Sequence, residues 1–309
     1  CKYLIVTGCL VQRYQEELKQ AIPEVDLFIS IKEYEILWKK IESMIEKRES
    51  PIKELDYQKR VITTGNTMAY LKIAEGCSNC CTYCAIPMIR GPFVSRKMED
   101  IIEEAKQLAK KGYKEIIVIA QDTTKYGIDL YQKPKLAELL EEISKIEGIE
   151  WIRFLYAYPE TITEELIQEV KNNEKICKYF DIPIQHIANR VLKRMNRKSD
   201  GNSIRNTIRR IREEIPEVII RTTCIVGFPG ETKEEFKELY EFVKEAKFDR
   251  LGAFMYSKEE GTPASRLPEQ IHPMTKKSRY RRLMELQKEI AQEKQKKYIG
   301  KQYKTIIES

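Results

Sequence analysis

The sequence predicts an α/β protein in which a partial (β/α)6 barrel, similar to a TIM barrel, follows part of a small α/β domain. Six apolar, strand-like runs alternate with amphipathic helical patterns between residues 66 and 298. Such alternation implies a parallel sheet with right-handed crossovers. Polar residues follow each of the six runs, and barrels of this type carry their chemistry at the carboxyl ends of the strands. An open, doubly wound sheet would satisfy the same pattern.

Residues 1 to 65 show a strand–helix–strand–helix order, which predicts the second half of a small α/β domain. A short strand over Leu4–Cys9 precedes a helix that ends at Pro23, and Asp26–Ser30 forms a second strand. Residues 32 to 49 predict a charged amphipathic helix, and residues 50 to 66 a polar linker. Because the chain starts inside a strand pattern, we expect that its N-terminus is missing.

The runs that predict the barrel strands are Tyr70–Glu75, Glu115–Asp122, Trp151–Pro159, Tyr179–Gln185, Val218–Phe228 and Arg250–Ser257. Helical patterns separate these runs. One of them repeats apolar residues at three- and four-residue spacing from Met98 to Leu108. Another begins at Thr232 with a capping box, in which Thr232 and Glu235 satisfy each other's backbone N–H groups.

Composition places the chain among globular proteins of a reducing compartment. Of its 309 residues, 42% are hydrophobic and 33% charged. No uncharged apolar run reaches the length of about 18 residues that spans a membrane, and we expect no signal peptide. Eight cysteines, four of them in one loop, favour metal ligation in the cytoplasm over disulfides. The net charge of +7 weakly indicates an acidic or nucleic-acid-rich partner.

Cysteines directly after the first barrel strand are the main functional signal. Cys77, Cys81 and Cys84 have the spacing Cys-x3-Cys-x2-Cys. A structural zinc site needs four protein ligands, and His186 and His272 lie far away in the sequence. A 4Fe–4S cluster held by three cysteines keeps one iron open, where a substrate can bind and be cleaved. A zinc knuckle or a set of disulfides is the alternative. Cys80 fits the spacing less well than Cys81.

The loop that closes this apolar strand resembles that of the radical S-adenosylmethionine enzymes. The resemblance implies that the open iron binds the amino and carboxylate groups of S-adenosylmethionine, and that the reduced cluster splits its sulfonium to a 5′-deoxyadenosyl radical. Arg221 can then hold the carboxylate of the cofactor, because a cation pairs well with it. The candidates for the ribose hydroxyls are Gln121, Asp181 and Gln185. Backbone near Tyr83 and around Val226 and Gly227 can pair with adenine. Singly, each of these residues has a structural explanation as well.

Three further segments are similar to one branch of that family, the methylthiotransferases. They are Val6–Tyr14, the Glu75–Cys84 loop with the following Ile86-Pro87 and Arg90-Gly91, and the pair Ile225–Glu231 and Tyr256–Ala264. The resemblance implies an auxiliary 4Fe–4S cluster with Cys9 as its third ligand. The other two ligands would lie upstream of residue 1, so the chain as written is not expected to hold that cluster.

The resemblance also implies a domain division and a reaction. Residues 1–65 would be the C-terminal part of the methylthiotransferase N-terminal domain with a linker, 66–298 the radical S-adenosylmethionine domain, and 299–309 the start of a TRAM domain with a first strand over Gly300–Ile307. Segments Ile119–Gly127 and Tyr156–Pro159 look like the RimO type. Such enzymes use two S-adenosylmethionine molecules to thiomethylate the β-carbon of an aspartate in ribosomal protein S12, with an electron donor such as flavodoxin or ferredoxin.

Two other functions stay open on these residues. Within the same branch, a transfer-RNA enzyme would place the methylthio group on an adenosine next to the anticodon. From another class, a zinc-bearing RNA-binding protein would use the same cysteines without catalysis. Iron and sulfide content distinguishes the zinc-bearing RNA-binding protein from both methylthiotransferases.

The C-terminal stretch from Lys276 to Lys304 is strongly basic, with eleven Lys or Arg against three Glu. Residues 275 to 298 predict a helix that turns Leu283, Leu286, Ile290 and Tyr298 towards the barrel. The basic face is either a solvated surface or a surface for RNA or the ribosome. A second basic run supports the latter and contains Arg190, Lys193, Arg194, Arg197 and Lys198.

Overall fold

The computed structural model describes residues 2–46, 62–63 and 65–307. The N-terminal part forms a small parallel pair, β1 (Ile5–Thr7) and β2 (Leu27–Ile29), connected by α1 (Cys9–Ala21). The helix predicted over 32–49 starts with a 3-10 turn, η1 (Ile31–Ile36), and continues as α2 (Leu37–Glu46). Most of the predicted linker lies outside the described residues.

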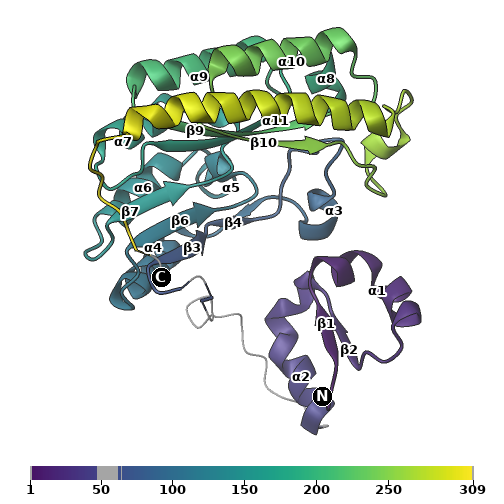
Figure 1. Cartoon of the computed structure of the whole chain (residues 1–309). Helices are drawn as coiled ribbons and strands as arrows, with labels where there is room; N and C mark the ends of the chain where they lie inside the picture. The colour runs from purple at the N-terminus through teal and green to yellow at the C-terminus, as the bar shows by residue number, and fades with distance from the viewer. Residues whose placement is uncertain (1, 47–61, 64, 308–309) are drawn as a thin grey trace.

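Six parallel strands form an incomplete barrel in the part of the chain that the structure describes (Figure 1). They are β3 (Met68–Lys72), β6 (Glu115–Ile119), β7 (Trp151–Phe154), β8 (Tyr179–Gln185), β9 (Ile219–Val226) and β10 (Arg250–Met255). Ladders join β3, β6 and β7, and a second set joins β8, β9 and β10. An isolated bridge between Ile152 and Ile176 and a 2.8 Å bond from Ala157 N to the Asp181 carbonyl connect the two sets. The predicted partial barrel is confirmed.

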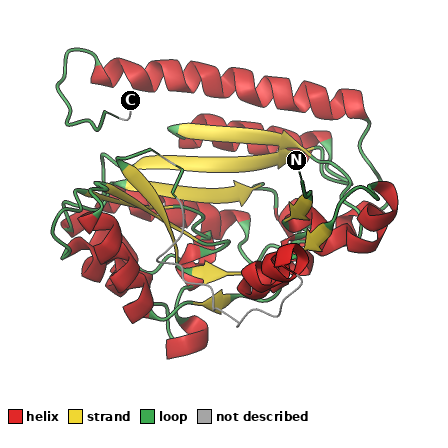
Figure 2. Cartoon of the chain, turned by 90° about the horizontal axis from the view of Figure 1, so that it is seen from below, coloured by secondary structure: helices red, strands yellow, loops and turns green. Residues whose placement is uncertain are grey.

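Helices cover the outer face of the strands, as Figure 2 shows from a second direction. The long ones are α4 (Met98–Lys110), α6 (Leu136–Ser144), α7 (Glu164–Asn172), α9 (Gly201–Glu214), α10 (Lys233–Ala246) and α11 (Pro273–Gln295). The capping box of α10 is formed: the Thr232 hydroxyl accepts from Glu235 N at 3.1 Å, and Glu235 Oε2 accepts from Thr232 N at 2.8 Å. Among the described helices, none has both the length and the apolar character that crossing a membrane requires.

Short elements shape the rim. They are the antiparallel pair β4 (Ala74–Glu75) and β5 (Val94–Ser95), the helices α3 (Ile86–Arg90), α5 (Ile128–Tyr131) and α8 (Asn189–Arg194), and the 3-10 turns η3 (Thr123–Lys125), η4 (Pro159–Thr161), η5 (Pro263–Arg266) and η6 (Lys296–Tyr298). Most of them follow the carboxyl end of a barrel strand, which is the end where the polar residues were predicted.

Alternating burial along the strands separates the core from the inner face. In β9, Ile220, Thr222, Cys224 and Val226 are buried, whereas the residues between them are more exposed. Because successive side chains of a strand point to opposite faces, the buried set faces the helices and the other set, with Arg221, faces the inside of the half-barrel. The apolar core therefore lies between strands and helices, and the inner face stays free for polar chemistry.

Three expected features differ from the structure. β7 ends at Phe154 rather than at Pro159, because Tyr156 adopts a left-handed φ of 61° and leaves the ladder. The strand expected over 300–307 is not formed, because this segment has no neighbouring strand to pair with. Tyr298, expected to face the barrel, is exposed and packs edge-on against Tyr303 with the ring centroids 5.4 Å apart.

Candidate active site at the barrel mouth

The cysteine loop starts directly after β4 at a position that only glycine can occupy. Gly76 has a left-handed φ of 74°, and a Cβ atom there would lie 2.0 Å from the carbonyl oxygen of Pro92. The next residue, Cys77, donates its backbone N–H to the carbonyl of Gly91 at 3.1 Å. The loop is therefore held closely against the Gly91–Pro92 segment, which leads into β5.

Three other elements hold the loop through hydrogen bonds. Asn79 Nδ2 donates to Oδ2 of Asp122, which follows β6, at 2.8 Å. The backbone N–H of Thr82 donates to the carbonyl of Met195 at 3.0 Å, and the Thr82 hydroxyl donates to the carbonyl of Arg194 at 2.8 Å. The backbone of η5 donates to the Thr82 carbonyl at 2.9 Å. The loop thus has a defined shape although it contains little regular structure.

The cysteines of the loop are free thiols that differ in exposure. Cys77 and Cys81 are only 7% and 6% exposed, and Cys84 is partly buried. Cys80 is exposed and has a left-handed φ of 52°, which sets it apart from the other three. Burial raises the pKa of the Cys77 and Cys84 thiols, and the charges of Cys81 and Cys77 add to the rise at Cys84.

Among the described residues, no three His, Cys, Asp or Glu side chains are grouped closely enough to hold a metal ion. The prediction that Cys77, Cys81 and Cys84 hold a 4Fe–4S cluster therefore still rests on their spacing. The donor chemistry fits such a cluster, because three free thiols in one loop are the soft ligands that iron–sulfur clusters take.

Two glutamines near the strand ends have unused acceptors. Gln121 follows β6, and Gln185 ends β8 in a left-handed conformation with φ 67°. Their Oε1 atoms are buried and accept no hydrogen bond from any described residue. A buried acceptor without a donor costs about 1–3 kcal/mol. Unused acceptors of this kind suit a ligand that brings hydroxyl donors, as the ribose of S-adenosylmethionine does.

Asp181 and Arg221 lie opposite each other on β8 and β9. The Nε of Arg221 is 3.7 Å from Oδ1 of Asp181, and the Arg221 side chain is 46% exposed. Asp181 also accepts the backbone N–H of Tyr156 at 3.2 Å. Burial raises the pKa of Asp181, and the charge of Arg221 opposes the rise. Arg221 can reach a ligand from the inner face, but Asp181 already neutralises part of its charge.

Backbone groups predicted to pair with adenine already have partners within the protein. Tyr83 packs on a small apolar cluster at the rim, where burial raises the pKa of its hydroxyl. The carbonyl of Val226 accepts from Tyr256 N at 2.9 Å, and Gly227 N donates to Oε2 of Glu231 at 2.6 Å. These two backbone groups already have protein partners, so that only the second lone pair of the Val226 carbonyl is left for a ligand.

A buried ion pair explains the shape of the turn after β9. Glu231 accepts the N–H groups of Gly227 and Phe228 and pairs with Arg279 of α11 at 2.9 Å. Burial raises the pKa of Glu231 to about 7, and the charge of Arg279 opposes the rise. Nearby, His186 uses Nδ1 to accept the N–H of Ala188 at 3.1 Å, so its observed role is in backbone capping.

The interpretation of residues 190–198 as a basic surface is wrong for Arg197, whereas Arg190 is exposed but has an acidic partner. Arg190 pairs with Glu235 at 2.7 Å. Arg197 is only 7% exposed, and its guanidinium carbon lies 4.2 Å from the ring centroid of Tyr158. The short helix α8 ends at Arg194, and the chain then turns back to the cysteine loop. Sequence reasoning missed Arg197 because a run of basic residues without acids is typical of a surface.

Cys9 lies at the start of α1, exposed and near the barrel. Its Sγ is 3.6 Å from Nη2 of Arg90, whose Nη1 pairs with Glu75 at 3.1 Å. Arg13 of the same helix forms an ion pair with Glu259, which follows β10. The N-terminal part of the chain therefore contacts the rim at Arg90 and at Glu259. Arg90, which follows the cysteine loop, connects Cys9 to Glu75, which precedes it.

The long basic helix α11 is partly a structural element. Leu283, Leu286 and Ile290 are buried as predicted. Lys276 donates to the Tyr256 carbonyl at 2.8 Å, and Lys294 pairs with Asp249 at 2.8 Å. Basic side chains that remain exposed on α11 and η6 are Lys277, Arg281, Arg282, Lys288, Lys296 and Lys297. Within α11 and η6, the predicted surface for RNA is reduced to this exposed set.

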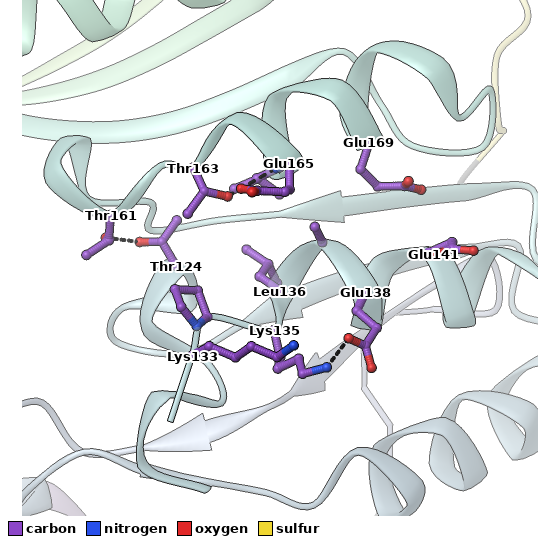
Figure 3. Close-up of a pocket in the computed structure, with 13 residues that line it drawn as sticks. Thr124, Lys133, Lys135, Leu136, Glu138, Glu141, Thr161, Thr163, Glu165 and Glu169 are labelled. Atoms are coloured by element: carbon purple, nitrogen blue, oxygen red, sulfur yellow. Dashed lines mark hydrogen bonds and ion pairs between the residues drawn. The ribbon is translucent and has the colours of Figure 1, made fainter. Parts of the chain in front are cut away.

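A separate pocket of about 560 Å³ lies between α6 and α7 on the outer side of the barrel (Figure 3). Thr124 and Thr161 face each other at its edge with their hydroxyls 2.6 Å apart, and Lys135 pairs with Glu138. The rest of the lining combines Glu141, Glu165 and Glu169 with mostly apolar residues. The residues that line this pocket include none of the predicted site residues, so its size alone does not make it the site.

Comparison with protein families identifies the barrel. The Radical SAM superfamily model matches residues 71–243. A ribosomal protein uS12 methylthiotransferase RimO from Alkaliphilus oremlandii is 66% identical over 309 residues, which is 100% of this chain and 70% of the relative. The protein of the same name from Clostridioides difficile is 55% identical over 99% of this chain and 70% of its own length.

Solved structures show the same fold at low sequence identity. The radical S-adenosylmethionine methyltransferase TsrM from Kitasatospora setae matches with a TM-score of 0.66 and 14% identity, over 84% of this chain and 57% of that one. Coproporphyrinogen III oxidase HemN from Escherichia coli, a radical SAM enzyme, matches with a TM-score of 0.51 and 18% identity, over 77% and 55% of the two chains.

Proposed function

The chain belongs to the RimO family of ribosomal protein uS12 methylthiotransferases within the radical SAM superfamily, and we propose that the Cys77–Cys84 loop is its catalytic centre. The observation that carries the function is identity of 66% and 55% along essentially the whole chain. The protein is accordingly an enzyme that transfers a methylthio group to ribosomal protein uS12 by a radical SAM mechanism. This family uses a 4Fe–4S cluster and S-adenosylmethionine.

Cys77, Cys81 and Cys84 are the proposed ligands of the cluster. When bound, the cluster supplies the electron that cleaves S-adenosylmethionine and so starts the radical reaction. The protein's part is to hold the thiols and to keep water out. Support comes from the deep burial of Cys77 and Cys81 and from the hydrogen bonds that fix Asn79 and Thr82 between them.

The proposed cofactor site uses the inner face of the half-barrel. Gln121 and Gln185 accept the ribose hydroxyls, since their Oε1 atoms lack other donors among the described residues. Arg221 binds the carboxylate, with Asp181 orienting its guanidinium across 3.7 Å. The adenine lies beside Tyr83 and the turn at Val226 and Gly227, where the Val226 carbonyl has one lone pair left.

We also propose a second cluster in the enzyme and the atom of the substrate that is modified. Cys9 is the proposed ligand of an auxiliary 4Fe–4S cluster, and two S-adenosylmethionine molecules serve each turnover, one of them for methylation of sulfur. The β-carbon of an aspartate in ribosomal protein uS12 receives the methylthio group. The position of Cys9 beside Arg90 supports this, because it brings the thiol to the same rim as the cysteine loop.

Domain division and partners complete the proposal. Residues 1–65, 66–298 and 299–309 are the proposed N-terminal, radical SAM and TRAM segments. The exposed basic residues of α11 offer a contact for ribosomal RNA, and flavodoxin or ferredoxin is the proposed electron donor. Since the substrate is a ribosomal protein, we propose that the enzyme works in the cytoplasm. The chain spans about 70% of the length of the curated relatives it matches.

The test offers one enzyme two substrates. The full-length protein, reconstituted with iron and sulfide under dithionite, receives S-adenosylmethionine with either a peptide spanning the uS12 aspartate loop or an anticodon stem-loop RNA. Mass spectrometry follows the replacement of a hydrogen by a methylthio group. We expect modification of the peptide alone. Modification of the RNA alone would contradict the assignment of substrate, and release of 5′-deoxyadenosine without modification of either would leave only the cluster site.

A further inference from the structure

The turn that ends α8 is joined to the cysteine loop residue by residue. The carbonyls of Arg194 and Met195 accept hydrogen bonds from Thr82, and Asn196 Nδ2 donates to the carbonyl of Cys80 at 2.9 Å. Asn196 has a left-handed φ of 56°, which reverses the chain direction. Arg197 directly follows these three residues in the chain.

Arg197 is a buried cation with an incomplete set of partners. Its side chain stacks on Tyr158, and Nη2 donates to the carbonyl of Pro183 at 3.2 Å. The Nε and Nη1 atoms are buried and have no hydrogen-bond partner among the described residues. Among the residues that the structure describes, no ion pair includes Arg197. Most of the other deeply buried charged side chains have an opposite charge nearby.

Such an arrangement is unfavourable unless an anion completes it. A guanidinium stays charged in proteins, and an uncompensated buried charge costs several kcal/mol. Each buried N–H without an acceptor adds about 1–3 kcal/mol. Burial lowers the pKa of Arg197, and the ionised forms of Tyr83, Tyr158, Cys81 and Glu160 would raise it.

Cys81 is the member of this group that changes charge when the site is loaded. The Ser199 hydroxyl donates to Glu160, whose carboxylate keeps the same charge with or without a cluster. Phenols stay neutral at pH 7. A thiol that binds a metal is deprotonated outright. Loading the cysteine loop would therefore place a permanent negative charge beside a cation that has free N–H groups.

We propose that Arg197 is the counter-cation of the cluster held by the cysteine loop, a positioning residue that stabilises the Cys81 thiolate and raises the reduction potential of the cluster. The inference rests on the proposed function, since it requires a cluster at this loop. Reduction adds one negative charge to the cluster, and a buried cation nearby favours the more negative state. Hydrogen bonds to cluster sulfurs and charge near them are known means of setting cluster potentials.

The experiment compares three proteins after anaerobic reconstitution: the wild type, Arg197→Met, and Arg153→Met as a matched control. Arg153 also lies over a tyrosine, with its guanidinium carbon 4.8 Å from the Tyr179 ring centroid, but it pairs with Glu115 at 2.8 Å near the amino ends of the strands. Two readouts that do not need turnover are taken. One is the midpoint potential from a dithionite titration followed by electron paramagnetic resonance, and the other is the rate of iron loss to a chelator.

We expect Arg197→Met to lower the equilibrium constant for one-electron reduction about tenfold, which is about 59 mV, and to speed up iron loss by a similar factor. Arg197→Lys, which keeps the charge, should restore most of the potential but less of the iron retention, because it lacks the planar fork. Arg153→Met should match the wild type in both readouts.

The outcomes distinguish a failure of the proposed function from a failure of the inference on Arg197. A wild type that binds no iron at this loop would overturn the proposed function and the inference with it. If the wild type loads and Arg197→Met keeps the wild-type potential and iron-loss rate, the inference alone is overturned. Circular dichroism of the apo proteins checks folding; if the Met variant does not fold, Arg197→Gln, which can keep the bond to Pro183, is measured against the same expectations.

Discussion

Replacing Gly76 with alanine should destabilise the cysteine loop, although the substitution adds only one methyl group. The left-handed φ of 74° already disfavours a residue with a Cβ atom. In addition, the new methyl group would lie 2.0 Å from the carbonyl oxygen of Pro92 and 2.7 Å from that of Gly91. These are backbone atoms, so no flexible side chain can move aside to accommodate it.

The size of the effect follows from two contributions. A left-handed backbone costs an L-residue roughly 1–2 kcal/mol. Moving the Gly91–Pro92 segment away from the methyl group also breaks its 3.1 Å bond with Cys77 N, which is worth about 1 kcal/mol. We therefore expect Gly76→Ala to lower the free energy of unfolding of the barrel by roughly 2–3 kcal/mol. The displaced Cys77 should also weaken retention of iron after reconstitution.

Gly112→Ala provides the matched control, because Gly112 has a left-handed φ of 92° but nothing within 4 Å of a new Cβ atom. It should cost only the conformational part, roughly 1–2 kcal/mol, and leave iron binding unchanged. Urea unfolding of the apo proteins, followed by far-ultraviolet circular dichroism, and iron content after desalting are the measurements. If both variants lose the same stability and retain the same iron, the close approach of Pro92 is not what fixes the loop.

Further predictions concern the thiols, a buried histidine and a helix cap. Cys81→Ala should abolish 5′-deoxyadenosine release while Cys80→Ala, at an exposed thiol, should keep it; activity in the Cys81 variant would remove that ligand from the proposal. Burial lowers the pKa of His186 from 6.5 to about 3, so the neutral ring contributes stability above pH 6.5 that is lost as pH falls towards 3. From pH 7 to pH 5 the wild type should lose roughly 2 kcal/mol more than His186→Asn. Glu231, whose pKa burial raises and whose Oε2 lies 4.0 Å from His186 Nε2, acts in the opposite direction in both proteins; equal acid sensitivity would refute the assignment. Thr232→Ala should lower the free energy of unfolding by about 1 kcal/mol, and an unchanged urea midpoint would mean that the cap is not formed in solution.

Local rules were sufficient for the elements of the barrel. The capping box at Thr232 and the buried stripe of α11 follow from residues three and four positions apart, and both are confirmed. The alternation of strand and helix likewise predicted the parallel half-barrel. By contrast, the early end of β7 depends on one left-handed residue, Tyr156, which no local pattern marks.

At the site, sequence reasoning found the thiols but not what holds them. The partners of the loop, Asp122, Met195 and the backbone of η5, are separated from it by tens to more than a hundred residues, so that only the fold brings them together. Arg197 was misread for the same reason. A basic residue among basic residues is usually on the surface, and burial here follows from a chain reversal after α8 that its neighbours do not predict.

The long range of these contacts has a consequence for assembly of the site. Closing a loop between distant segments costs conformational entropy that local contacts do not repay. Because the Thr82 carbonyl is bound by η5, which follows the last strand β10, the cysteine loop can reach its final shape only after the whole half-barrel has closed. A cluster that needs this shape would then be retained only by the folded barrel, and the same barrel closure would bring Gln121, Gln185 and Arg221 to their places. Binding of iron and binding of S-adenosylmethionine are therefore expected to depend on one folding event, although their side chains come from different strands.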